Sequence, residues 1–195
     1  NRFSQMAALV LAASVSFMAS QTAVSANGWE VLPAAKAPNT KPVQKFTVGV
    51  TSEKAPAGQP DGLVAKSPSG IIRSAWYSAP TTRYAHGIMG DAIEAARLLV
   101  TDQNGSQYAA VLPRRFVFED RYPRLADLDG DGTAEVISIL ADSRAGAAIA
   151  IYSLVNQRLT KVAQTPHIGT PNRWRNVAGI ADYNGDGQLE IMEVD

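Results

Sequence analysis

Two short acidic segments of the chain repeat one pattern of residue types. DLDGDGTAE begins at Asp127, and DYNGDGQLE begins 55 residues later at Asp182. Both carry an acid or an amide at positions 1, 3, 5 and 9, and glycine at positions 4 and 6. Such an arrangement suits Ca²⁺, a hard cation that takes about six to eight oxygen ligands. The pattern therefore predicts two calcium sites.

The expected ligands are the side chains at positions 1, 3, 5 and 9 and the backbone carbonyl at position 7. Without a cation, two carboxylates about 4 Å apart repel by about 4 kcal/mol at an effective dielectric near 20. Asp-Gly pairs are also ordinary turn formers, but two copies with the same acidic positions favour metal binding. Loop two carries three formal charges instead of four because Asn184 replaces an aspartate. The predicted sites are Asp127, Asp129, Asp131, Thr133 and Glu135 in loop one, and Asp182, Asn184, Asp186, Gln188 and Glu190 in loop two.

The segments that flank the loops predict strands. VISIL follows loop one and IMEV follows loop two, and both are short, apolar and strand-like in composition. The alternative is a helical calcium hand of the EF-hand or dockerin type, which needs a glutamate at position 12. Ser138 fails this test in loop one, whereas Glu193 passes it in loop two. We expect strand–loop–strand units, with the helical hand as the minor alternative.

The segments RLADLDGDGTAEVISIL and GIADYNGDGQLEIMEVD resemble FG-GAP repeats, also called VCBS repeats. The resemblance covers residues 121–195 and implies an all-β fold, a partial β-propeller of the integrin α-like type also seen in secreted bacterial proteins. It implies that calcium is structural and that its loop joins the first two strands of a blade. It also implies that a protein or glycan partner engages the opposite face of the propeller.

The N-terminal residues 1–26 have the features of a secretory signal peptide. Arg2 supplies the positive start, and MAALVLAASVSFMA is an apolar core too short to span a bilayer. No cysteine is present, so neither disulfides nor a lipid-anchored cysteine is expected. The predicted location is the periplasm or the outside medium, without a transmembrane anchor. Because the last blade has barely begun its second strand, we expect the sequence to be part of a longer protein.

The charge balance argues against nucleic acid as a partner. The chain has 18 Lys and Arg and 18 Asp and Glu, and removal of residues 1–26 removes only Arg2. The remaining chain has a net charge of about −1 and no overall basic field to attract phosphates. A protein or a glycan is the expected class of ligand.

Composition divides the rest of the chain into two parts. Residues 27–69 are rich in proline and alanine and predict a leader or linker, with one candidate strand at 46–51. Residues 70–195 predict an incomplete propeller with hairpin turns at Asn104-Gly105 and Asn156-Gln157. Two interpretations remain for segment 83–100: a decayed blade that has lost its metal loop, or a short helix over 91–99.

No catalytic residue is predicted. His86 and His167 lack a neighbouring nucleophile motif, and His167 is expected to form a structural hydrogen bond in a connecting loop. Trp174 lies between Arg173 and Arg175, where it could stack on a sugar, although packing between blades is the favoured interpretation. An enzyme, a polysaccharide lyase or a hydrolase (or an accessory domain of one), remains the alternative to a recognition module.

Overall fold

The computed structural model describes residues 49–67, 70–84 and 92–195. These residues form an all-β structure without a helix. The predicted signal peptide and most of the predicted leader lie outside the described residues. The strands are β1 (Val50–Lys54), β2 (Leu63–Lys66), β3 (Ile72–Thr81), β4 (Glu94–Asp102), β5 (Gln107–Val111), β6 (Phe116–Ala126), β7 (Glu135–Asp142), β8 (Gly146–Val155), β9 (Arg158–Gln164), β10 (Asn176–Ala181) and β11 (Glu190–Val194).

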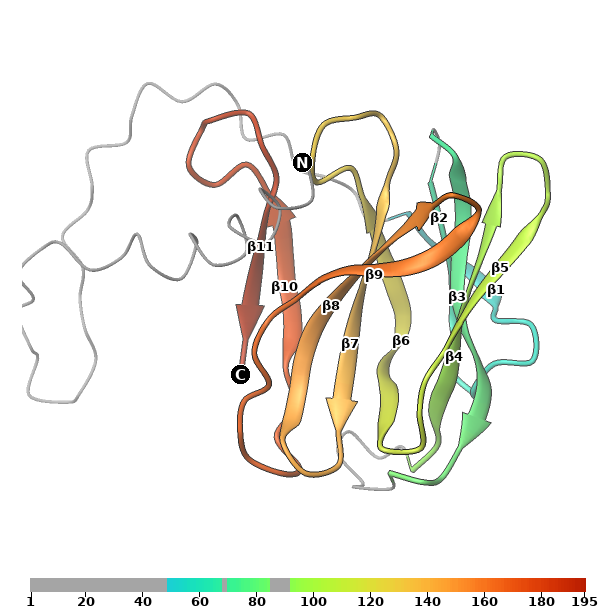
Figure 1. The fold of residues 1–195 in the computed structure, drawn as a ribbon, viewed down its shortest axis with the longest axis vertical. Helices are drawn as coiled ribbons and strands as arrows, with labels where there is room; N and C mark the ends of the chain where they lie inside the picture. The colour runs from blue at the N-terminus through green and yellow to red at the C-terminus, as the bar shows by residue number, and fades with distance from the viewer. Residues whose placement is uncertain (1–48, 68–69, 85–91) are drawn as a thin grey trace, which may run out of the picture.

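The strands form antiparallel meanders, as a propeller requires. One sheet runs β1-β2-β3-β4-β6-β7-β8-β9, with β5 paired to β4, and β10 pairs with β11 beside it (Figure 1). Strands β6 to β9 are a four-stranded meander, the unit of a propeller blade. Strands β2 to β5 repeat this order, and β10 and β11 correspond to the first two strands of a third unit. The predicted all-β, propeller-like architecture is confirmed.

The two predicted hairpin turns are present. Strands β8 and β9 pair up to Val155 and Arg158, and the two residues between them have positive φ angles of 48° and 58°. Two-residue turns of this kind match the right-handed twist of the strands. In the β4–β5 turn, the Asp102 carboxylate accepts hydrogen bonds from the backbone N–H groups of Asn104 and Ser106.

The sheet begins earlier than the sequence suggested. We expected the ordered part to start near Gly70, but β1 and β2 precede it; β1 pairs with β2, and β2 pairs with β3. Ala65 of β2 is fully buried, and the Trp76 indole N–H donates to the Pro56 carbonyl at 3.2 Å. Proline and alanine made this region resemble a linker, whereas its short strands gain their stability from contacts distant in sequence.

Segment 83–100 fits neither of the two interpretations left open. Its described residues from Glu94 onward form β4, because pairing on both edges overrides the helix propensity of this alanine-rich stretch. The β3–β4 connection also lies at the end of the sheet opposite the acidic loops, where the Tyr84 hydroxyl accepts from the backbone N–H of Asn172. The first meander's counterpart of a calcium loop is instead the β2–β3 connection. Asp91 and His86 lie outside the described residues.

Two apolar clusters hold the meanders together. In the first, the rings of Tyr77 and Phe118 stack at 5.1 Å, and Tyr152 meets Phe118 edge to face at 5.9 Å. The second joins the middle meander to the β10–β11 pair through Ile137, Ile149 and Ile180. The middle meander therefore has covered faces on both sides, and loop one is anchored to the most buried part of the structure.

Candidate metal centre

Glycines at positions 4 and 6 give both acidic loops their shape. Gly130 and Gly132 have φ angles of +72° and +88°, and Gly185 and Gly187 have +80° and +91°. Residues with a Cβ rarely adopt this left-handed conformation. Two such turns in close succession bend the chain so that alternate side chains face the same side.

The two loops share one set of five hydrogen bonds. The carboxylate at position 1 accepts hydrogen bonds from the backbone N–H groups of positions 5 and 6. The two distances are 3.1 and 2.9 Å for Asp127 in loop one and 3.1 and 2.9 Å for Asp182 in loop two. Position 3 accepts from the N–H of position 5, and position 5 accepts from the N–H of position 7. Position 9 accepts from the N–H of position 2. The repeat in sequence is thus a repeat in geometry.

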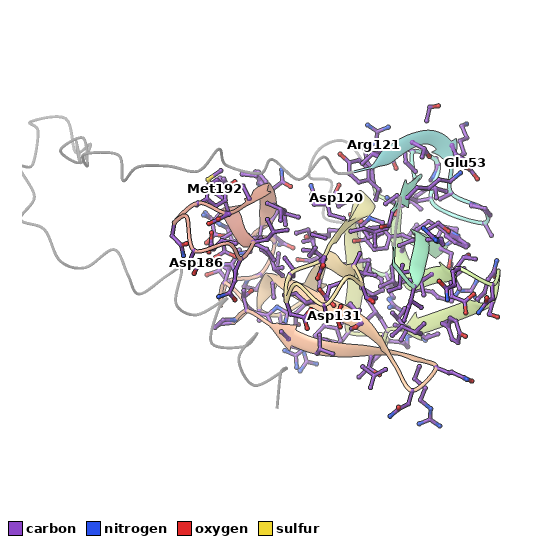
Figure 2. All side chains as sticks on the ribbon, turned by 90° about the horizontal axis from the view of Figure 1, so that it is seen from above. Glu53, Asp120, Arg121, Asp131, Asp186 and Met192 are labelled. Carbon is purple, nitrogen blue, oxygen red and sulfur yellow. The ribbon has the colours of Figure 1, made fainter. Side chains whose placement is uncertain are left out.

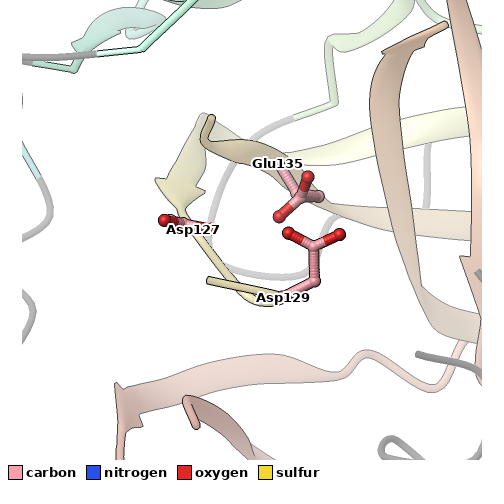
Figure 3. Close-up of side chains that lie close together, drawn as sticks. All are labelled: Asp127, Asp129 and Glu135. Carbon is pink, nitrogen blue, oxygen red and sulfur yellow. The ribbon is translucent and has the colours of Figure 1, made fainter. Parts of the chain in front are cut away.

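In each loop, three carboxylates converge. One oxygen from each of Asp127, Asp129 and Glu135 lies within 4.8 Å of the others, and Figure 3 shows the carboxylates of Asp129 and Glu135 facing one another. Asp182, Asp186 and Glu190 form the corresponding group in loop two. Both clusters consist of hard oxygen donors, which a divalent cation of the Ca²⁺ or Mg²⁺ type prefers. Either cluster could hold a metal ion.

Glu135 is the most buried acid of the two clusters, with 2% of its surface exposed. Burial, together with the negative charges of Asp129, Asp131 and Asp127, raises its pKa to about 8. The Leu128 N–H, which donates at 2.9 Å, opposes this shift. A charged Glu135 is therefore costly in this place unless a cation compensates it.

Loop two has the same geometry in a more exposed setting. Glu190 is half-buried and Asp186 is exposed. The side-chain amide of Asn184 donates to Glu190 at 2.9 Å and to Asp186 at 3.2 Å, so that part of the acidic charge is already compensated. Viewed from the loop end of the molecule, Asp131 lies among the sheets, whereas Asp186 lies at one side with Met192 (Figure 2).

The structure brings six of the ten predicted ligands into the two carboxylate groups. Asp131 and Asn184 belong to the same hydrogen-bonded rings. For Thr133 and Gln188, the structure shows that their N–H groups bond to position 5, and ligation through their carbonyls stays a prediction. The N–H groups of Leu128 and Tyr183, which orient the glutamates, were missed because a main-chain donor leaves no signal in residue type.

A neighbouring loop also supports loop one. Gly70, which precedes β3, has φ +81°, and a Cβ at this residue would lie 2.8 Å from the Gly132 carbonyl oxygen. The contact joins the β2–β3 connection of the first meander to the metal loop of the second. Sequence position could have suggested this contact, since Gly70 lies in the connection that corresponds to the acidic loops of the later units.

The helical calcium hand is excluded. Glu193 lies in β11 and pairs with Arg175 at 3.4 Å instead of facing the loop. Strands flank both loops, as β6 and β7 enclose loop one and β10 and β11 enclose loop two. The paired backbones of these strands leave no place for the two helices of such a hand.

The other candidate residues have structural contacts. His167 Nδ1 lies 2.8 Å from the Gly146 carbonyl, which can only accept, so this nitrogen carries the proton. Trp174 was expected to be buried between blades, but 39% of its surface is exposed. Its neighbour Arg175 pairs with Asp195 and Glu193. Nothing in the described part of the chain packs over Trp174 closely enough to bury it.

Residues 120–192 match the family model of the FG-GAP-like repeat. The match runs from within β6 to within β11 and includes both acidic loops. No curated protein and no solved structure matches the chain. This segment is an FG-GAP-like repeat, and together with the all-β meanders it makes the described structure a propeller-like repeat module. No helix in the described residues is long and apolar enough to cross a membrane.

Proposed function

We propose that this protein is an exported calcium-binding propeller module that recognises a protein or glycan partner, and that calcium has a structural role in it. One observation carries the calcium part. Two loops, 55 residues apart, have the same five hydrogen bonds and converge three carboxylates each. Simple turns need one aspartate to cap the chain. They do not need a buried glutamate such as Glu135 facing two further acids.

The cation would act through linkage between binding and folding. The side chains at positions 1, 3, 5 and 9, with the carbonyl at position 7, would hold it in each loop, and its charge would offset the repulsion among the acids. Because the ligands come from both sides of the turn, a bound ion ties β6 to β7 and β10 to β11. At a calcium concentration of one hundred times Kd, each site would add about 2.7 kcal/mol to the free energy of unfolding.

Export and recognition rest on other observations. Export to the periplasm or the medium rests on the sequence of residues 1–26 alone, and N-terminal sequencing of the protein from cells should then begin at Asn27. The recognition role is supported by the repeat type, since FG-GAP repeats often mediate protein interactions.

Thermal unfolding tests the calcium part directly. The protein is melted in EDTA, in millimolar Ca²⁺ and in millimolar Mg²⁺, and calorimetric titration counts the sites. We expect calcium to raise the melting temperature by several degrees, with two sites and a weaker response to magnesium. Asp129→Ala should abolish one site, whereas Glu53→Ala, an exposed acid outside the loops, should leave both. A calcium response equal in wild type and Asp129→Ala would reject loop one as a metal site.

A further inference from the structure

The connections at the two ends of the sheets carry opposite charges. Those after β4, β6, β8 and β10 lie at the calcium-loop end, which is uppermost in Figure 1, and they contain five aspartates and no lysine or arginine. The described connections after β3, β5, β7 and β9 lie at the other end and contain no Asp or Glu. Their six arginines are Arg83, Arg114, Arg115, Arg144, Arg173 and Arg175. We call this end the arginine end. The described connections at the two ends therefore differ in charge, although the net charge of the chain is zero.

Direct contacts hold the arginine-bearing connections together. Arg83 donates to the carbonyls of Leu112 and Phe116 across to the β5–β6 connection. Ser143 N–H donates to the Arg115 carbonyl at 3.2 Å, and Ala147 N–H donates to the Arg173 carbonyl at 3.0 Å. The described parts of the four connections thus contact one another rather than standing as four separate loops.

Two of the six arginines are neutralised by acids at the ends of strands. Arg115 forms a two-point ion pair with Asp142, with distances of 2.7 and 2.5 Å. Arg175 pairs with Asp195 at 2.6 Å and with Glu193 at 3.4 Å. Arg83, Arg114, Arg144 and Arg173 form no ion pair with any described acid, and the last three are exposed. The positive charge of Arg114, Arg144 and Arg173 is therefore available to a partner.

The β1–β2 connection, residues 55–62, does not contribute to this end. It lies along β3, where Ala79 N–H donates to the Ala57 carbonyl, and its Asp61 pairs with Arg121 at 3.1 Å. Trp174, which follows Arg173 in the sequence, is an exposed large aromatic residue of the arginine end, with 39% of its surface accessible. An exposed indole on the same end of the molecule as exposed guanidinium groups offers a flat apolar face for a sugar ring and charges for its acidic substituents.

We propose that the arginine end is the docking surface for an acidic polysaccharide that bears uronate carboxylates. The carboxylates would pair with Arg114, Arg144 and Arg173, and a sugar ring would stack on Trp174. The Arg115–Asp142 pair shows the two-point geometry that a guanidinium adopts toward a carboxylate at this end. The inference rests on the proposed recognition function and names its partner class, but the binding contacts themselves do not involve the calcium loops.

Titration calorimetry with short oligogalacturonate tests this proposal, with the full chain saturated with calcium and at low salt. We expect binding that weakens as sodium chloride is added. The triple variant Arg114→Ala/Arg144→Ala/Arg173→Ala should bind about tenfold more weakly, since each exposed ion pair contributes little alone. The matched control is Lys54→Ala/Arg158→Ala/Lys161→Ala, which removes the same charge from exposed residues elsewhere and should bind like wild type. Trp174→Ala should bind about threefold more weakly with an unchanged salt dependence.

Four results would overturn the proposal. These are no binding, equal loss in the control triple variant, equal binding of neutral dextran, and poly-L-glutamate bound more tightly than the oligosaccharide. The last result would identify an acidic protein segment as the partner. Calcium-dependent melting of the same variants is measured in parallel and should be unchanged. A lost calcium response with intact oligosaccharide binding would refute only the calcium proposal, and the reverse result would refute only this one.

Discussion

The two acidic loops differ in what surrounds them and not in how they are built. Their five shared hydrogen bonds and their paired glycines are alike. Glu135 at position 9 is nevertheless 2% exposed, whereas Glu190 is half-buried. Every residue of β7 is buried, while the last three residues of β11 are exposed.

The difference comes from the neighbouring strands. Strand β7 pairs with β6 and β8 and contributes to both apolar clusters, whereas β11 pairs with β10 only among the described strands. Local residue types determine the shape of a metal loop. The surrounding sheet determines how much a change in that loop alters the free energy of unfolding. The same substitution should therefore have unequal effects in the two loops.

The largest inequality is expected at position 11, behind each loop. Ile137 is fully buried in the second apolar cluster, while the equivalent Met192 is 46% exposed. Ile137→Ala should lower the free energy of unfolding by about 2–5 kcal/mol, because it leaves a cavity. Met192→Ala should change it by less than about 0.5 kcal/mol. Chemical denaturation in calcium measures both, and equal losses would show that β11 is as well covered as β7.

A second inequality concerns the buried charge at position 9. Glu135→Gln keeps an acceptor for the Leu128 N–H but removes the charge. In calcium, the variant should lose most of the stabilisation from site one, about 2.7 kcal/mol at one hundred times Kd. In EDTA at pH 8 it should instead be more stable than wild type, because no charged group remains to be buried. The stability of Glu190→Gln should differ less from that of the wild type in both conditions.

The pH dependence of stability in EDTA tests why Glu135→Gln should destabilise the protein in calcium but stabilise it in EDTA. The pKa of Glu135 is raised by burial to about 8 in the folded protein, from 4.5 in the unfolded chain. Glu135 should therefore not lower the metal-free stability of the wild type below about pH 4.5, where it is neutral in both states. As the pH rises from there towards 8, the free energy of unfolding should fall by a few kcal/mol at most. Glu135→Gln should remove this fall. A slope that persists in the variant would assign it to another group.

The residues that shape the loops could be predicted from sequence because their chemistry is local. Aspartate and glycine at fixed positions determine the turn, and apolar flanks such as VISIL determine strands. The hairpin turn at Asn156-Gln157 was predictable for the same reason. These signals need no knowledge of the rest of the fold.

The sequence failed where long-range contacts decide. Strand β2, in the expected leader, and β4, in the segment left open between a decayed blade and a short helix, are held by pairing with β3, which no local pattern reveals. Trp174 was expected to be buried because large aromatics usually are, yet the structure leaves it partly exposed. The burial of Glu135 likewise follows from β7 and its neighbours, so the cost of its charge could not be read from the loop sequence.

The smallest effect is expected when the residues at position 3 of the two loops are exchanged. Asn184→Asp should bind calcium about tenfold more tightly at loop two, since it restores the fourth formal charge. Without metal, the variant should be about 1 kcal/mol less stable, because the Asn184 amide bonds to Glu190 and Asp186 are replaced by repulsion. Asp129→Asn should weaken calcium binding at loop one and should make the metal-free protein more stable. Calorimetric titration resolves the two affinities, and a tighter loop two with unchanged stability in EDTA would show that these amide bonds contribute nothing to the metal-free fold.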